Sequence, residues 1–140
     1  MHTLWIEQCV VQRIGLRDGL VLNFNDNNEL VIATPMRLTS PPVEPHPEEQ
    51  VLVDPKHFHD YEVPLLNFSG AAVTEACCEE NGALRVSFSH GHRIDVDPDE
   101  NETAWELYGR RHGYMACLPP GRVRVVRHDL PDDELDRASK

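Results

Sequence analysis

The sequence predicts a mainly β protein, α+β at most, in which two related antiparallel β-meanders form a small roll or sandwich with one short helix. The first observation is a repeated hairpin. Residues 19–32 align without a gap with residues 83–96, which places Phe24 on Phe88. The second is that apolar and polar residues alternate in both stretches, as they do in half-buried strands. The third is the regular spacing of turn residues between these runs, which is typical of hairpins.

The first meander begins with a run rich in β-branched residues. Leu4 to Leu16 predicts a first strand, and Arg17-Asp18-Gly19 predicts the turn that follows it. Leu20 to Phe24 alternates with a period of two and predicts the second strand. After a turn at Asp26-Asn27-Asn28, Leu30 to Leu38 predicts a third strand.

Between the two meanders the composition changes. Four prolines fall within residues 41–47, which excludes a central strand or helix and predicts an exposed loop. Gln50 to Val53 predicts a short edge strand. Asp54 is a favourable N-cap and Pro55 suits the first helical position, so we expect a helical turn or two within Lys56 to Leu66.

The second meander is bounded by clear turn signals. Ala72 to Cys78 and Leu84 to Phe88 predict two strands that pair across Asn81-Gly82, a strong hairpin dipeptide. His90-Gly91 then predicts a turn into a third strand at Arg93 to Val96.

Three more strands are expected after the second meander. Residues 105–108 alternate apolar and polar, which predicts a strand that buries Trp105; the alternative is the end of a short helix capped by Asp99. Tyr114 to Leu118 and Val123 to Arg127 predict the last two strands.

The chain of 140 residues has the length of one domain. We expect a single β-rich domain over 1–128, with an internal duplication of about 4–38 and 67–98, and a charged, flexible tail over 129–140. Upstream of the ungapped match, removal of one residue places Val10 on Val73 and Ile14 on Cys77.

Composition excludes several classes of protein. The net charge of −11 argues against nucleic-acid binding, which requires a basic surface. The chain has neither an apolar run long enough for a membrane span nor the pattern of a signal peptide. The four cysteines form no Cys-x-x-Cys motif. These features favour a cytoplasmic protein with reduced thiols.

The acidic residues are unevenly distributed and suggest a partner of opposite charge. Their simpler interpretation is a solvated surface; the functional one is an acidic face that binds a basic protein. Loops on a rigid sheet are where binding residues gather. The candidate partner-binding residues are therefore the acids of the two long loops and the strand end beside them: Glu44, Glu48, Glu49, Asp95, Asp97, Asp99 and Glu100.

No group of residues predicts catalysis. The chain has no nucleophile elbow, P-loop or dinucleotide fingerprint. An alternative function is a metal-binding protein or metal-dependent hydrolase that uses His90, His92 and nearby carboxylates, since two imidazoles two residues apart share one face of a strand. The same positions are also ordinary turn positions, because they align with Asp26 to Asn28 of the first repeat. No cofactor is expected.

The two repeats differ on their outward faces. Arg85, Arg93 and Asp95 face outward in the second repeat, whereas Val21 and Val31 take matching positions in the first. An apolar outer face requires a cover. We expect the C-terminal strands to provide it, with a homodimer or partner interface as the alternative.

The C-terminal half carries three short elements that together resemble a known pattern. They are Phe88-Ser-His-Gly-His-Arg-Ile-Asp-Val-Asp-Pro-Asp, Thr103-Ala-Trp-Glu-Leu-Tyr-Gly109 and Cys117-Leu-Pro-Pro-Gly-Arg-Val-Arg-Val. They resemble a family of small actinobacterial proteins of unknown function with a Trp-Glu-Leu-x-Gly element. His90, Thr103 and Pro120 depart from its Asp, Glu and Gly. The pattern is also similar to that of toxin-immunity proteins. The resemblance implies a bacterial protein that acts by binding, and it assigns no catalytic residue.

Overall fold

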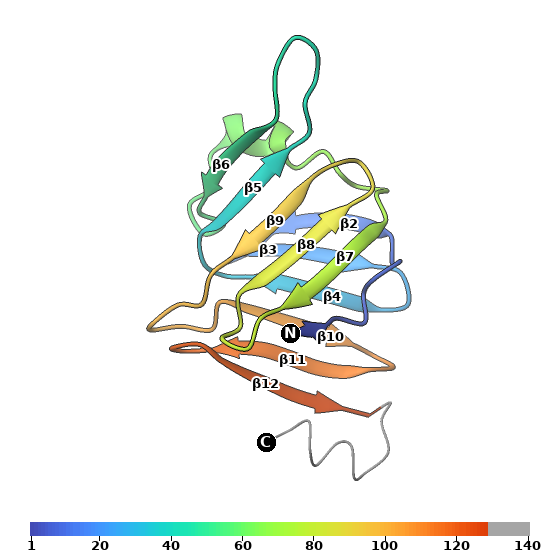
Figure 1. Ribbon diagram of the computed structural model, residues 1–140, viewed down its shortest axis with the longest axis vertical. Helices are drawn as coiled ribbons and strands as arrows, with labels where there is room; N and C mark the ends of the chain where they lie inside the picture. Colours follow the sequence, from blue (N-terminus) through green and yellow to red (C-terminus); the bar gives the residue numbers. More distant parts are fainter. Residues whose placement is uncertain (129–140) are drawn as a thin grey trace.

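The computed structural model describes residues 1–128 and shows two antiparallel sheets of six strands each, packed as a β-sandwich (Figure 1). The predicted fold class is confirmed. One sheet has the order β1 (His2–Thr3), β7 (Val73–Cys78), β8 (Leu84–Phe88), β9 (Arg93–Val96), β5 (Met36–Ser40), β6 (Glu49–Val53). The other has the order β12 (Arg122–Arg127), β11 (Gly113–Leu118), β10 (Trp105–Gly109), β4 (Asn28–Ile32), β3 (Leu20–Phe24), β2 (Val11–Leu16). The expected tail over 129–140 lies outside the described residues.

The two meanders pair their strands in the same way, while the internal duplication stays a prediction. In β2–β3–β4 and β7–β8–β9, each phenylalanine faces a valine on the preceding strand: Phe24 faces Val11, and Phe88 faces Val73. Both first strands contain a β-bulge beside that valine. Because both bulges lie at the same place, they leave the two strands in step, but the β7–β8 turn is longer by two residues than the β2–β3 turn. Val11 rather than Val10 therefore corresponds to Val73, and the predicted match of Val10 with Val73 is wrong.

The two repeats exchange strands. After β4 the chain leaves the sheet that contains β2, β3 and β4, and β5 pairs with β9 in the other sheet. After β9 the chain crosses back, and β10 pairs with β4. The single strand predicted over Leu30 to Leu38 is therefore two strands in two sheets. Of the strand predicted over Leu4 to Leu16, only Val11–Leu16 is a strand (β2); residues 5–8 form a turn, and β1 lies before the predicted segment.

The expected helical turns lie within Lys56 to Leu66, but they form a 3₁₀-helix that begins after the predicted cap. A 3₁₀-helix, η1, spans Asp60–Leu65 and contains Pro64. Asp54 does not cap it. Its carboxylate instead accepts a hydrogen bond from the Lys56 backbone N–H at 3.0 Å, which closes a local turn.

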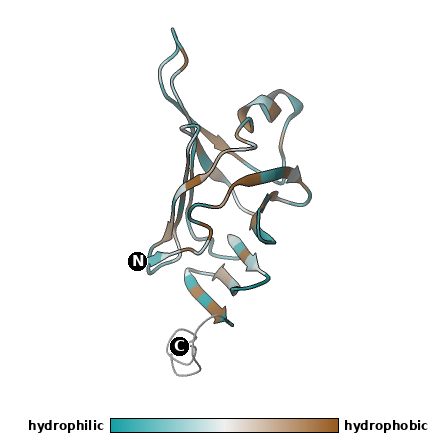
Figure 2. Ribbon diagram, turned by 90° about the vertical axis from the view of Figure 1, so that its right-hand side faces the viewer, coloured by the Kyte–Doolittle hydropathy of each residue, from teal (hydrophilic) through white to brown (hydrophobic). Residues whose placement is uncertain are grey.

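The core lies between the sheets and combines residues from both repeats. Phe24, Phe88 and Trp105 are all at most 3% exposed, as the alternating pattern predicts. The side view in Figure 2 shows hydrophobic and hydrophilic segments alternating along single strands. In the described part of the chain, no helix is both long and apolar enough to span a membrane.

Trp105 is expected to report the native core by fluorescence. Its side chain is fully buried, and its indole N–H donates a 2.8 Å hydrogen bond to the Gly82 carbonyl. The chain has two tryptophans, and the other one, Trp5, is only partly buried. A Trp5→Phe variant therefore isolates the Trp105 signal. We expect blue-shifted emission in the native state and a red shift on unfolding in urea. Native emission typical of a water-exposed indole would contradict this placement.

Candidate functional site

The connection between β5 and β6 projects beyond both sheets (Figure 1). We call residues 41–49 the acidic hairpin. The Val43 N–H donates a 2.9 Å hydrogen bond to the His46 carbonyl, and the two residues form a β-bridge across Glu44-Pro45. Glu44, Glu48 and Glu49 are all exposed. The segment is therefore an ordered hairpin that carries three carboxylates.

The other candidate acids lie at the opposite end of the same sheet. The acidic hairpin follows the end of β5. Because β5 runs antiparallel to β9, the connection that follows β9 leaves the sheet near the start of β5. Asp97 pairs with Arg37 through distances of 2.6 and 3.3 Å, and this hydrogen bonding lowers the pKa of Asp97. Asp99 accepts the Asn101 and Glu102 backbone N–H groups, and Glu100 is exposed. The structure thus places the predicted acids in two separate groups.

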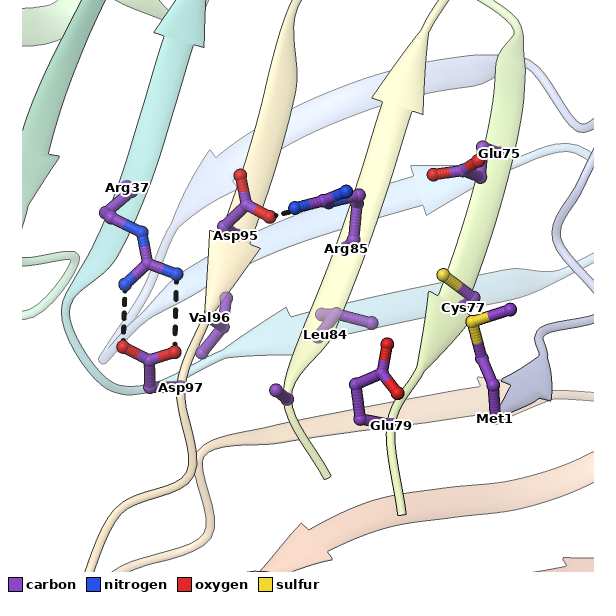
Figure 3. Close-up of a pocket in the computed structure, with 11 residues that line it drawn as sticks. Met1, Arg37, Glu75, Cys77, Glu79, Leu84, Arg85, Asp95, Val96 and Asp97 are labelled. Carbon is purple, nitrogen blue, oxygen red and sulfur yellow. Dashed lines mark hydrogen bonds and ion pairs between the residues drawn. The ribbon is translucent and has the colours of Figure 1, made fainter. Parts of the chain in front are cut away.

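Asp95 is not an exposed acid, contrary to the sequence-based expectation. It is only 5% exposed, and its two carboxylate oxygens accept hydrogen bonds from Arg85 Nε and Arg93 Nε, each at 2.9 Å (Figure 3 shows the Arg85 contact). A buried carboxylate requires such partners. This arrangement gives Asp95 a structural role and makes it unavailable as a surface charge for a partner.

The strand face that carries Asp95 is hollowed beside Cys77 (Figure 3). The cavity measures about 270 Å³, and its wall includes Glu75, Cys77 and Glu79. Burial, followed by the charge of Glu75, raises the pKa of the Cys77 thiol. Burial also raises the pKa values of the other three cysteines, that of Cys78 to about 12. Protonated thiols are poor nucleophiles, so the geometry does not favour cysteine catalysis.

The two histidines proposed for a metal occupy different environments. His90 is exposed, whereas His92 is 5% exposed, and its ring lies 5.1 Å from that of Phe68. Among residues 1–128, no three histidine, cysteine, aspartate or glutamate side chains are grouped to hold a metal ion. His92 instead lines a cavity of about 250 Å³ at the base of the acidic hairpin, and its Nδ1 is enclosed without a hydrogen-bond partner.

The burial of His92 predicts a loss of stability in mild acid. Burial, with a smaller contribution from His90, lowers its pKa below the usual value of about 6.5. Near pH ~6.5 the unfolded chain binds a proton at this histidine that the folded chain does not yet bind. The free energy of unfolding is therefore unaffected by His92 protonation above pH ~6.5 and decreases as the pH falls below that value. Urea unfolding at several pH values should show a smaller decline for His92→Asn than for the wild type. A His128→Asn variant, which removes an exposed imidazole, is the control. Equal declines for all three proteins would contradict the assignment.

Val21 and Val31 form part of the outer face of the other sheet. The C-terminal strands do not cover them as expected, because β10, β11 and β12 extend the same sheet beside β4. Both valines are partly buried beside a hollow of about 530 Å³ whose wall also includes Gly15 and Leu16. A homodimer through this face stays a prediction.

Sequence reasoning missed two features of these surfaces. The first is the pair of arginines around Asp95. The β8–β9 turn sets a register in which Arg85 lies opposite Asp95, so this pair could have been found from the hairpin alone. The second is the cavity beside His92. Its walls come from three segments that are distant in the sequence, so no local pattern predicts it.

Comparisons with known proteins identify a family without assigning an activity. A search of curated proteins and a search of solved structures find no match to this chain. One family model, a family of unknown function (DUF6188), matches residues 2–127. This agrees with the expected family of unknown function, whereas the actinobacterial origin and the likeness to immunity proteins stay predictions. Because the match covers most of the 140 residues, the chain belongs to the DUF6188 family.

Proposed function

We propose that this protein is a non-enzymatic binding protein that holds a basic protein partner through its acidic hairpin. The observation that carries the proposal is the projection of three exposed carboxylates on an ordered loop. Within the described residues, Glu44, Glu48 and Glu49 have no ion pair with a cation. Their field is therefore available to a positively charged surface.

The hairpin also has features that reduce the entropic cost of binding. Four prolines restrict the backbone of residues 41–47, and the Val43–His46 bridge joins its two arms. A loop that is ordered before contact loses less freedom on association. Val43 is 64% exposed beside Glu44, which adds an apolar contact to the charged ones. Apolar residues surrounded by charge are common in protein interfaces.

The acids of the β9–β10 connection support the proposal less well. Asp97 is already paired with Arg37, and Asp99 accepts hydrogen bonds from the backbone N–H groups of Asn101 and Glu102. Of these three acids, only Glu100 has no ion pair or hydrogen bond to its carboxylate from another described residue. The acidic hairpin is therefore the better binding surface. The resemblance of the Trp-Glu-Leu-x-Gly element to immunity proteins favours a toxin as the partner, and we propose this class as the first to test.

The proposal is tested by charge reversal. A Glu44→Lys/Glu48→Lys variant should lose a partner that the wild type captures from a lysate of the source cells, with affinity for the purified partner reduced roughly ten-fold, or about 1.4 kcal/mol. A Glu79→Lys/Glu100→Lys variant makes the same change in net charge elsewhere and should retain the partner. Association should also slow as salt rises from about 0.05 to 0.5 M. Equal retention by both variants would contradict the proposal.

A further inference from the structure

The cavity beside His92 opens at the base of the acidic hairpin. It measures about 250 Å³. The hairpin supplies one part of its wall, η1 and the residues after it supply a second part, and the β8–β9 turn supplies His92. The lining residues are Ser40, Pro41, Val43, His46, Pro47, Glu49, Pro64, Leu65, Asn67 and His92. Since pockets for drug-sized ligands measure about 300–1,000 Å³, this cavity suits a smaller group.

The lining combines apolar walls with hydrogen-bonding groups. Prolines, Val43 and Leu65 form the apolar part. No lysine or arginine lines the cavity, while Glu49 contributes a carboxylate that has no cation partner among the described residues. The charge of the lining thus favours a cation over an anion.

His92 provides an independent sign of an unfilled site. It is 95% enclosed by the protein, yet Nδ1 has no hydrogen-bond partner, an arrangement that is uncommon in buried polar groups. Because burial lowers its pKa, the imidazole is neutral at pH 7 and does not repel a cation. Asn67 and Ser40 add oxygen atoms that can accept hydrogen bonds.

We infer that this cavity receives an arginine side chain of the partner. This inference rests on the proposed function and specifies the residue that the partner presents. The methylene stem packs on the prolines and Leu65, and the guanidinium lies against the Glu49 carboxylate. A planar guanidinium with five N–H donors suits a site in which several acceptors lie around one charge. Lysine offers three donors around a point charge and matches this lining less well.

The inference can be tested on the protein alone, without the partner. N-butylguanidinium is titrated into the protein and followed by two-dimensional NMR. We expect saturable shifts at Val43, Leu65 and His92, with a Kd on the order of 1 mM, as befits a fragment of this size. Glu49→Gln should weaken binding at least five-fold, whereas Glu100→Gln, at the opposite end of the sheet, should leave it unchanged. Glu49 is exposed on an edge strand, so its variant is expected to fold, which circular dichroism checks.

The comparison probes decide between chemistries. N-butylammonium should bind more weakly than N-butylguanidinium, and n-pentanol should not bind. No saturable shift, binding that Glu49→Gln leaves unchanged, or equal binding of the two cations would overturn the inference. A partner captured through the hairpin without probe binding refutes this inference alone. Probe binding without any captured partner refutes the proposed function and leaves the cavity assignment standing.

Discussion

Replacing either repeated phenylalanine by alanine should remove much of the stability of the protein. Phe24→Ala and Phe88→Ala are each expected to cost about 3–5 kcal/mol, the range measured when a buried aromatic ring is truncated and leaves a cavity. Both rings are at most 3% exposed. Since the total stability of a domain is about 5–15 kcal/mol, either change approaches the limit of folding. Urea unfolding followed by far-ultraviolet circular dichroism measures the loss.

The Phe88 variant should be the more damaging of the two. Its ring centroid lies 4.6 Å from that of Phe68, and an aromatic pair adds about 0.5–1.5 kcal/mol to the area that is buried. Leu52→Ala is the control, because Leu52 is 69% exposed on the edge strand β6 and should change stability by less than about 0.5 kcal/mol. Losses below about 1 kcal/mol at both phenylalanines would show that the repeats do not share one core.

Gly109→Ala should also destabilise the protein, by about 1–3 kcal/mol, because the site has no room for a methyl group. A Cβ atom at Gly109 would lie 2.5 Å from Trp5 Nε1 and 2.6 Å from Asn28 Oδ1. These two atoms are joined by a 2.9 Å hydrogen bond, and the Asn28 amide also donates to the Asn25 carbonyl. Relief of the clash therefore breaks a network that satisfies a buried amide.

Gly15→Ala is the matched control for this change. Gly15 also lies in a strand of the same sheet, but nothing is within 4 Å of a Cβ built there. The substitution should be neutral or stabilise the protein by up to about 1 kcal/mol, since glycine in a strand is less favourable than alanine. Equal unfolding midpoints for the two variants would show that the Trp5–Asn28 contact does not fill the space above Gly109.

Local patterns in the sequence were sufficient to predict most strands. β3, β8 and β9 span the predicted residues, because in each the apolar residues alternate between clear turns. The burial of Trp105 followed from the same alternation. Its neighbour Gly109 could not be interpreted from the sequence, because the reason for glycine there is Trp5, a residue more than a hundred positions away.

The candidate site was less predictable than the strands. The exposed proline-rich loop with Glu44 and Glu48 was predicted correctly, since prolines and charges exclude a core position. The burial of Asp95 was not predicted, because it depends on two arginines that fold over it. The cavity at His92 depends on η1 packing near the hairpin, and the sequence carries no local signal for that contact.

The sequence by itself determined the alternation of each strand and the position of its turns, because these follow from interactions among near neighbours. Only the tertiary structure decided which sheet each strand joins. The alternation of residues 30–38 is compatible with one strand, yet β4 and β5 pair with opposite halves of the molecule. Backbone hydrogen bonds between strands carry no information about residue type, so the partners were selected by the burial of side chains from both repeats in one core.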